Sequence, residues 1–228
     1  MNAPLAPILA IDTSMTEACV VLADPAGTVL AADAWVAGHR HGEELLPRVD
    51  ALLARSGVRV ADLRGVVVGL GPGAFTGLRV GIATAKGIAE GLGIPIAGIS
   101  SAAILAGAAA SAGVAADAAD VAVLFPAGPS ERTLVVGGRA VRIAAGEDPD
   151  PAPGTVLVAV DLPGRAPSDA LAAGVAARAL FGAELARAGT ARLAAGGDDL
   201  ARLVPEYVTP PRGVSAITGE VAWSRTRA

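Results

Sequence analysis

A strand, a glycine-rich turn and a helix follow one another between residues 65 and 91, and this segment constrains the fold more than any other. Residues 65–70 are almost entirely apolar, which predicts a buried strand. Residues 71–77 contain three glycines and one proline, and residues 76–91 have the spacing of a helix. Because glycine loses more conformational entropy on folding than other residues, this turn must follow a backbone path that only glycine permits. A strand, a glycine turn and a helix start can together point backbone N–H groups at an anion.

The turn matches neither of the common nucleotide-binding patterns closely. It lacks the Gly-Lys-Ser/Thr sequence of a Walker A loop, and Pro72 interrupts the loose dinucleotide pattern that runs from Gly69 to Ala74. Two interpretations stay open: the glycine amides line an anion or nucleotide site, or glycine lets the loop pass close beneath another strand. Thr76 could equally cap the helix. The candidate residues are Gly71, Gly73, Thr76 and Gly77.

The rest of the chain predicts an α/β fold. Residues 8–14, 17–23 and 28–37 have the alternating or apolar pattern of a three-strand meander. A helix is predicted at 42–55 and a further strand at 94–99. The predicted elements of the second half are a helix at 101–113, strands at 121–125, 133–136 and 156–160, and a helix that Ser168 caps and that runs to about Arg187. Strands that alternate with helices indicate the α/β class.

Composition narrows the class of protein. Hydrophobic residues make up 53% of the chain, but the longest weakly polar stretch, 102–116, is too short and too rich in alanine to span a bilayer. No signal peptide is evident at the amino terminus, and a single cysteine fits a reducing compartment. We therefore expect a cytoplasmic protein that does not contact a membrane.

The charge of the chain argues against direct binding of nucleic acid. The formal net charge is −4, Lys86 is the one lysine, and aromatic residues make up 3% of the chain. A protein that holds RNA by itself normally has clustered lysine and arginine, and aromatic side chains on which bases stack. If the chain serves an RNA, we expect a partner to hold that RNA.

Residues 71–81, Gly-Pro-Gly-Ala-Phe-Thr-Gly-Leu-Arg-Val-Gly, resemble the bacterial TsaB (YeaZ) family, which takes part in making threonylcarbamoyladenosine in tRNA. Residues 8–22, 41–47 and 94–101 resemble the family's opening hairpin, the start of its first helix and the strand that closes its first half. The resemblance covers about the first 100 residues well and the rest poorly. Residues 205–208, Pro-Glu-Tyr-Val, are a weaker echo of the family's Pro-x-Tyr-Leu-Arg stretch.

The resemblance implies an actin-like, sugar-kinase-like ATPase fold with two small α/β lobes, each with a ribonuclease H-like core. It divides the chain into an N-terminal lobe at 1–102, a degenerate second lobe at 103–204 and a C-terminal tail at 205–228. This fold is a structural duplication, although the sequence shows no internal repeat.

In the fold that the resemblance implies, the turn after the first strand faces a nucleotide phosphate, and its aspartate can reach a metal-bound water. Asp12, Thr13 and Ser14 occupy that turn here. The alternative is an ordinary strand-ending turn, whose side chains bond to their own backbone. We expect no cofactor, although a nucleotide could bind weakly at or near a subunit interface.

Positions that carry metal ligands in catalytic relatives differ in this chain. TsaD-type proteins have a His-x-x-x-His pair that binds a metal, and alignment places Ser101 and Leu105 at those two positions. Leucine cannot ligate a metal. The chain's own histidines, His39 and His41, are two ligands at most, so we expect no metal site.

A second loss concerns an acidic residue of the second half. The family commonly has Asp-Ala-Arg after a strand, where this chain has Phe125-Pro126-Ala127. An ATPase of this fold needs acidic groups from both halves to hold magnesium and orient water. We therefore expect little or no catalytic activity from the chain alone.

The resemblance also suggests a surface for a partner. In the family, the helices that correspond to 42–55 and 77–91 meet the equivalent pair on a partner and form a helical bundle. The alternative is that small and aliphatic residues on these helices merely pack on the sheet. The candidate interface residues are Leu45, Val49, Leu52, Val80, Ala83, Thr84 and Gly87.

Two hypotheses of function follow. In the first, the chain is a non-catalytic scaffold that binds a TsaD-type catalytic subunit, and with it a TsaE-type ATPase subunit, to make N6-threonylcarbamoyladenosine at tRNA position 37. It would contact tRNA only indirectly and could form a homodimer when alone. The alternative is a stand-alone enzyme of the actin-like fold, either a small-molecule kinase or a carbamoyl transferase.

Overall fold

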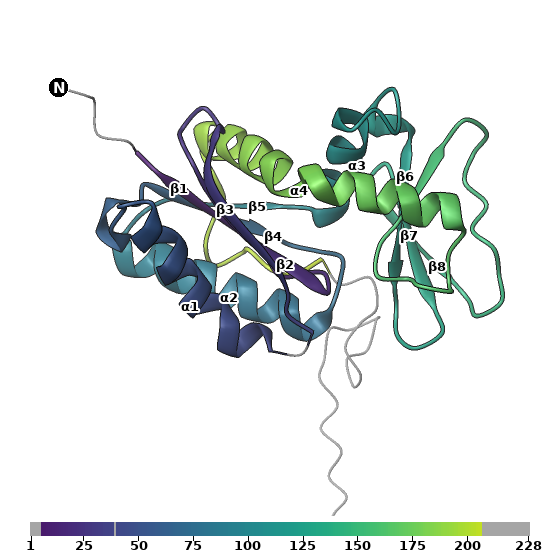
Figure 1. Cartoon of the computed structure of the whole chain (residues 1–228), viewed down its shortest axis with the longest axis horizontal. Helices are drawn as coiled ribbons and strands as arrows, with labels where there is room; N and C mark the ends of the chain where they lie inside the picture. The colour runs from purple at the N-terminus through teal and green to yellow at the C-terminus, as the bar shows by residue number, and fades with distance from the viewer. Residues whose placement is uncertain (1–5, 39, 207–228) are drawn as a thin grey trace, which may run out of the picture.

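Two β-sheets, one from each half of the chain, form the frame of the molecule (Figure 1). The structure is a computed structural model and describes residues 6–38 and 40–206. The first sheet has the strand order β3-β2-β1-β4-β5, in which β1 is antiparallel to β2 and parallel to β4. Its strands are β1 (Ile8–Asp12), β2 (Glu17–Ala23), β3 (Val29–Val36), β4 (Gly65–Gly69) and β5 (Ile96–Ile99).

The second sheet repeats the arrangement of the first. Its strand order is β8-β7-β6-β9, so that a three-strand antiparallel meander is again followed by a fourth strand parallel to the first. The strands are β6 (Val121–Pro126), β7 (Arg132–Val136), β8 (Arg139–Ile143) and β9 (Val156–Ala159). The expected structural duplication is therefore present in the strand topology.

The sequence did not predict strand β8. Its first four side chains are exposed on the edge of the second sheet, so the segment has no apolar run. A hairpin signal does precede it, because Gly137 and Gly138 both have positive φ and connect β7 to β8.

Helices α1 (His41–Arg55) and α2 (Phe75–Leu92) cover one face of the first sheet (Figure 1). Alternate residues of β1 and β4, such as Leu9, Ile11 and Val66, face these helices because side chains on a strand alternate between its two faces. Leu45 of α1 and Ile82 of α2 pack against them. This face forms one of the buried apolar clusters of the protein.

Helices α3 (Ser101–Ser111) and α4 (Ser168–Ala194) lie on the opposite face and connect the two sheets (Figure 1). The first half of α4 touches the second sheet, where Gly174 lies against Ala159 of β9. Its second half touches the first sheet, where Gly189 lies against Val67 of β4. The lobe boundary at residue 102 stays a prediction, but α4 packs on both sides of it.

Two short helices, η1 (Val60–Asp62) and η2 (Ala118–Asp120), complete the fold. None of the helices in the described ranges has the length and apolar character needed to cross a lipid bilayer.

Helix α4 ends at Ala194, beyond the predicted end near Arg187. The predicted cap was wrong, because Pro167 is the N-cap and Ser168 is the first helical residue. The predicted tail, 205–228, lies outside the described residues after Glu206.

Substitution of Gly174 should test the packing of α4 on the second sheet. A Cβ atom at this position would lie 1.9 Å from the backbone oxygen of Ala159, so Gly174→Ala forces the helix and strand apart. We expect the free energy of unfolding to fall by about 1–3 kcal/mol, measured by urea denaturation. The control is Gly87→Ala, where a Cβ atom meets nothing within 4 Å, and where the better helix propensity should add up to about 1 kcal/mol. An equal gain in both variants would show that α4 does not pack as described.

Candidate functional site

The end of β1 and the glycine turn, which the sequence singled out separately, lie directly against each other. A Cβ atom added at Gly73 would lie 2.0 Å from the carbonyl oxygen of Ser14, and one at Gly77 would lie 2.1 Å from that of Thr13. The amide of Ala74 donates a hydrogen bond of 2.7 Å to the Ser14 carbonyl. This geometry supports the interpretation in which glycine permits a close approach of two backbones. Whether the same residues bind a nucleotide stays a prediction.

Asp12 is fully buried at this junction. Its Oδ1 accepts hydrogen bonds from the Ser14 amide at 2.8 Å and from the Ser14 hydroxyl at 2.6 Å, and its Oδ2 accepts one from the Ser101 hydroxyl at 2.6 Å. Burial raises the pKa of the Asp12 carboxyl above its ordinary value, and the three hydrogen bonds oppose that rise. Both carboxylate oxygens are therefore engaged inside the protein.

Ser101 links the first strand, the glycine turn and α3. Besides its bond to Asp12, its hydroxyl accepts the amide of Gly71 at 3.1 Å, and its own amide donates to the Gly71 carbonyl at 2.6 Å. Gly71 has φ of +97°, a left-handed conformation that favours glycine. Thr13 adds a further link, because its hydroxyl donates to the Gly77 carbonyl at 2.7 Å. The position expected to hold a metal ligand in relatives thus holds a hydrogen-bonding serine.

Thr76 does not cap α2, which excludes one of the alternatives left open for this residue. The helix begins one residue earlier, with Ala74 as its N-cap and no side-chain cap hydrogen bond. Thr76 lies in the first turn of the helix and is exposed to solvent. The helix starts early because the Ala74 amide is fixed on Ser14 and the Ala74 carbonyl accepts the Leu78 amide.

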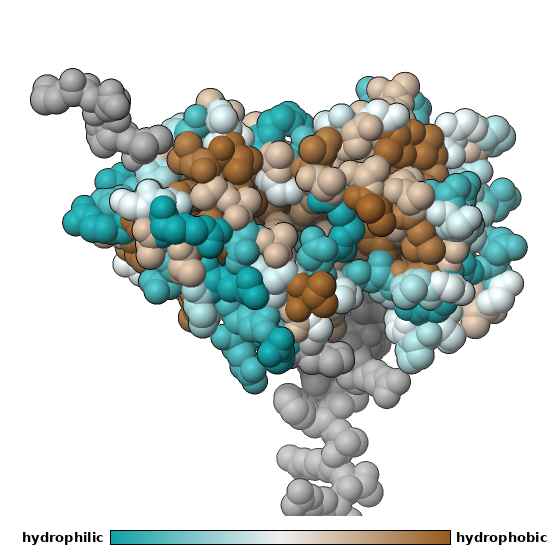
Figure 2. All heavy atoms as spheres, in the orientation of Figure 1, coloured by the Kyte–Doolittle hydropathy of each residue, from teal (hydrophilic) through white to brown (hydrophobic). Residues whose placement is uncertain are grey.

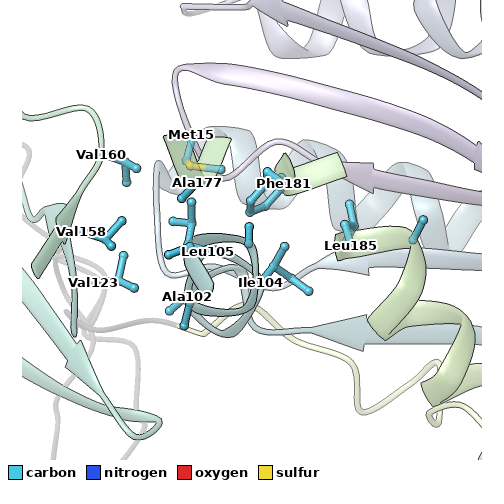
Figure 3. Packing of buried hydrophobic residues seen from close by; sticks show 14 of the residues in the cluster. Met15, Ala102, Ile104, Leu105, Val123, Val158, Val160, Ala177, Phe181 and Leu185 are labelled. Carbon is cyan, nitrogen blue, oxygen red and sulfur yellow. The ribbon is translucent and has the colours of Figure 1, made fainter. Parts of the chain in front are cut away.

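Leu105, the second aligned metal position, lies in the core between the two sheets (Figure 3). In the close-up its side chain lies between the second-sheet strands and a group from Met15, Ala177 and Phe181. Phe125 belongs to the same buried cluster. These residues do not fit a metal, since none of them offers a ligand at the aligned position.

Among residues 6–38 and 40–206, no three His, Cys, Asp or Glu side chains come together in a way that could hold a metal ion. His41 is buried, with Nε2 3.3 Å from the Met15 carbonyl oxygen. His39 lies outside the described residues.

Three of the candidate interface residues were wrongly placed. Leu45, Val49 and Leu52 are buried and face the sheet, because the leucine-rich stripe of α1 is the stripe that packs inward. The four candidates on α2 lie on a different stripe. Ala83 and Gly87 are exposed, and Val80 and Thr84 are half-buried.

The exposed side of α2 includes three small residues, Ala83, Gly87 and Gly91, with Arg79 and Glu90 beside them. Cβ atoms added at Gly87 or Gly91 would meet nothing within 4 Å, so these two glycines serve no packing contact in the described part of the chain. The sequence reasoning missed Leu46 of α1, which is 56% exposed. Leu46 directly follows Leu45, so it lies about 100° around the helix from the stripe that packs inward.

A cavity of about 560 Å³ opens between α3 and the second sheet. Ser100 and Glu206 are the polar side chains at its edge, and the Ser100 hydroxyl donates to the Glu206 carboxylate at 2.8 Å. Partial burial raises the pKa of Glu206. No motif in the sequence indicates this cavity, because alanine, glycine and valine form most of its lining.

Comparison with known proteins places these observations in a family. The family model TsaD, described as tRNA N6-adenosine threonylcarbamoyltransferase, matches residues 35–190. The chain is 43% identical over 93 residues to the tRNA threonylcarbamoyladenosine biosynthesis protein TsaB of Escherichia coli, which covers 41% of this chain and 39% of the relative. It is 38% identical over 94 residues to the TsaB protein of Bacillus subtilis, with 41% of each chain covered. The match thus spans about two fifths of the length of these curated relatives.

The structure is also similar to a solved one over most of its length. YeaZ from Pseudomonas aeruginosa superposes with a TM-score of 0.67 at 25% identity, and the match covers 90% of this chain and 100% of that one. The actin-like fold that the resemblance implied is confirmed, together with the likeness to TsaB and YeaZ proteins.

The buried carboxyl of Asp12 predicts a pH dependence of stability. Because its pKa is raised in the folded state above the ordinary 3.8, the native protein keeps this proton to a higher pH than the unfolded chain does. The contribution of Asp12 to stability therefore falls as pH rises from about 3.8 through the folded pKa. Asp12→Asn removes this titration, so the free energy of unfolding of the variant minus that of the wild type should increase over this window. Urea denaturation at several pH values measures the difference, and a difference that is independent of pH would contradict the assignment.

The core position of Leu105 predicts a second outcome. Leu105→Ala should lower the free energy of unfolding by about 2–5 kcal/mol, because it opens a cavity between the two sheets. Leu46→Ala is the matched control and should change it by less than about 0.5 kcal/mol, since this leucine is largely exposed. Chemical denaturation followed by circular dichroism compares the two. Similar losses would mean that Leu105 is not a core residue.

Proposed function

The chain belongs to the tRNA N6-adenosine threonylcarbamoyltransferase (TsaD) family, as a homologue of its TsaB proteins, and on this premise we propose that it is a non-catalytic subunit. In this role it binds and supports a TsaD-type catalytic subunit that makes N6-threonylcarbamoyladenosine at tRNA position 37. Because the proposed reaction acts on tRNA, we expect the protein in the cytoplasm.

The observation that carries the proposal is the chemistry of two aligned positions. Ser101 is committed to hydrogen bonds with Asp12 and Gly71, and Leu105 is part of the apolar core. Neither can hold the metal that a TsaD-type pair of histidines would bind. The alternative is a stand-alone kinase or carbamoyl transferase. Such an enzyme would need the carboxylate at the end of β1 to reach its substrate, but Asp12 is fully buried.

The outer side of α2 is the surface that we assign to the partner. Glycine in the middle of a helix costs up to about 1 kcal/mol relative to alanine, and in the described part of the chain Gly87 makes no contact that would offset this loss. Small residues allow another helix to approach closely. Ala83 extends this stripe and Leu46 of α1 adds an exposed apolar side chain.

The same stripe would also bring two copies of this chain together, so we expect a homodimer to compete with the complex. A TsaE-type subunit would join the complex, and tRNA would contact it only through the partner, because this chain has a net charge of −4 and a single lysine. No cofactor is required for this role.

A second apolar surface provides the control for this assignment. Figure 2 shows hydrophobic side chains gathered over α4, whereas hydrophilic side chains cover the side of α1 that faces the viewer. Val175 of α4 is 72% exposed, and α4 lies on the opposite face of the first sheet from α2 (Figure 1). The two surfaces can therefore be tested separately.

Ala83→Glu should abolish binding to the TsaD-type protein of the same organism without unfolding the chain, since it puts a charge in the middle of a helix contact. Val175→Glu should leave binding unchanged. Size-exclusion chromatography of each variant mixed with the partner, with circular dichroism as the folding control, measures both. Loss of the complex with Val175→Glu alone would move the interface to α4. Failure of the wild-type chain to form any complex would refute the proposed role.

A further inference from the structure

The loop after β9 reaches across to the first lobe at the tip of the β1–β2 turn. Oδ2 of Asp161 accepts a hydrogen bond of 2.7 Å from the backbone amide of Thr16. Thr16 follows the Asp12–Ser14 segment, the turn that faces a nucleotide phosphate in actin-like proteins. The Asp161 carboxylate thus accepts the hydrogen bond of a turn amide that a phosphate oxygen would otherwise accept.

Arg178 of α4 joins the same contact. One of its terminal nitrogens lies 3.0 Å from the Glu17 carboxylate and the other 3.6 Å from Oδ1 of Asp161. The side chains of Arg178 and Asp161 are only 16% and 19% exposed, so solvent screens their interaction weakly. We call Thr16, Glu17, Asp161 and Arg178 the interlobe clasp.

The backbone at Asp161 is held in an unusual conformation. Its φ is +56°, and among the described residues it is the one non-glycine residue with positive φ. Aspartate tolerates this left-handed region better than most residues, but the conformation is still unfavourable. It is fixed from both sides, because the Val160 amide donates to the Leu124 carbonyl and the Leu162 side chain is fully buried.

We propose that the interlobe clasp is a closed anion site, in which the Asp161 carboxylate substitutes for a phosphate-bearing ligand. The amide of Thr16 and the guanidinium of Arg178 are the groups that bind phosphate oxygens in proteins. Where a bound phosphate would bridge the turn and the second lobe, this chain supplies the bridging anion itself. The clasp therefore keeps the two lobes together without a nucleotide and keeps such ligands out, whether or not the chain binds a TsaD-type partner.

Three variants separate the carboxylate from the backbone that carries it. Asp161→Gly removes the anion and keeps the left-handed backbone accessible. Asp161→Asn keeps an acceptor oxygen and tolerates the same φ. Asp161→Gly combined with Arg178→Gln also removes the positive charge.

Isothermal titration calorimetry with inorganic pyrophosphate measures the effect of these changes. We expect Asp161→Gly to bind pyrophosphate at least about tenfold more tightly than the wild type, as one or two charge-assisted hydrogen bonds become available. Asp161→Asn and the double variant should stay within about twofold of the wild type. Equal affinity in the wild type and in folded Asp161→Gly, or binding that persists in the double variant, would overturn the proposal.

The wild-type chain offers a test that does not depend on a variant that folds. Thr16 is exposed to solvent, so the hydrogen bond to the Asp161 carboxylate is what protects its amide from exchange. Hydrogen exchange followed by NMR should therefore show the Thr16 amide at least about tenfold slower than in an unstructured chain. An amide that exchanges at the unstructured rate would show that the clasp does not form.

Discussion

The apolar contact of α3 and α4 with both sheets is the interaction on which the rest of the structure depends. Each sheet alone has four or five strands, and neither buries both of its faces without these helices. The cluster takes Val67 from the first sheet, Leu105 and Phe181 from the helices, and Val158 from the second sheet. Because such cores are closely packed, this cluster holds the two sheets in fixed contact through α3 and α4.

The hydrogen bonds at the end of β1 depend on this packing. Helix α3 starts at Ser101, whose hydroxyl meets the buried carboxylate of Asp12, and α4 brings Arg178 to the tip of the same turn. The turn between β1 and β2 is thereby tied to α3 on one side and to the second lobe on the other. A subunit with this arrangement is suited to present a fixed surface to a partner.

Much of the first lobe could be predicted from the sequence, because its strands are apolar runs and its glycine turn has few alternatives. Strand β8 could not be found from hydrophobicity, since an edge strand with exposed arginines carries no apolar pattern. Periodicity on α1 identified a stripe but not the direction in which it faces, so Leu45 was assigned to a partner when it packs on the sheet. The bond between Asp161 and Thr16 joins residues 145 positions apart, and no local pattern announces it.

The central claim is that this chain supports catalysis by a partner without carrying it out. The most direct measurement is incorporation of labelled threonine into tRNA by the TsaD-type protein alone, by this chain alone and by the two together, with all other reaction components held constant. We expect incorporation with both proteins and none with this chain by itself. Incorporation by this chain without the TsaD-type protein would contradict it.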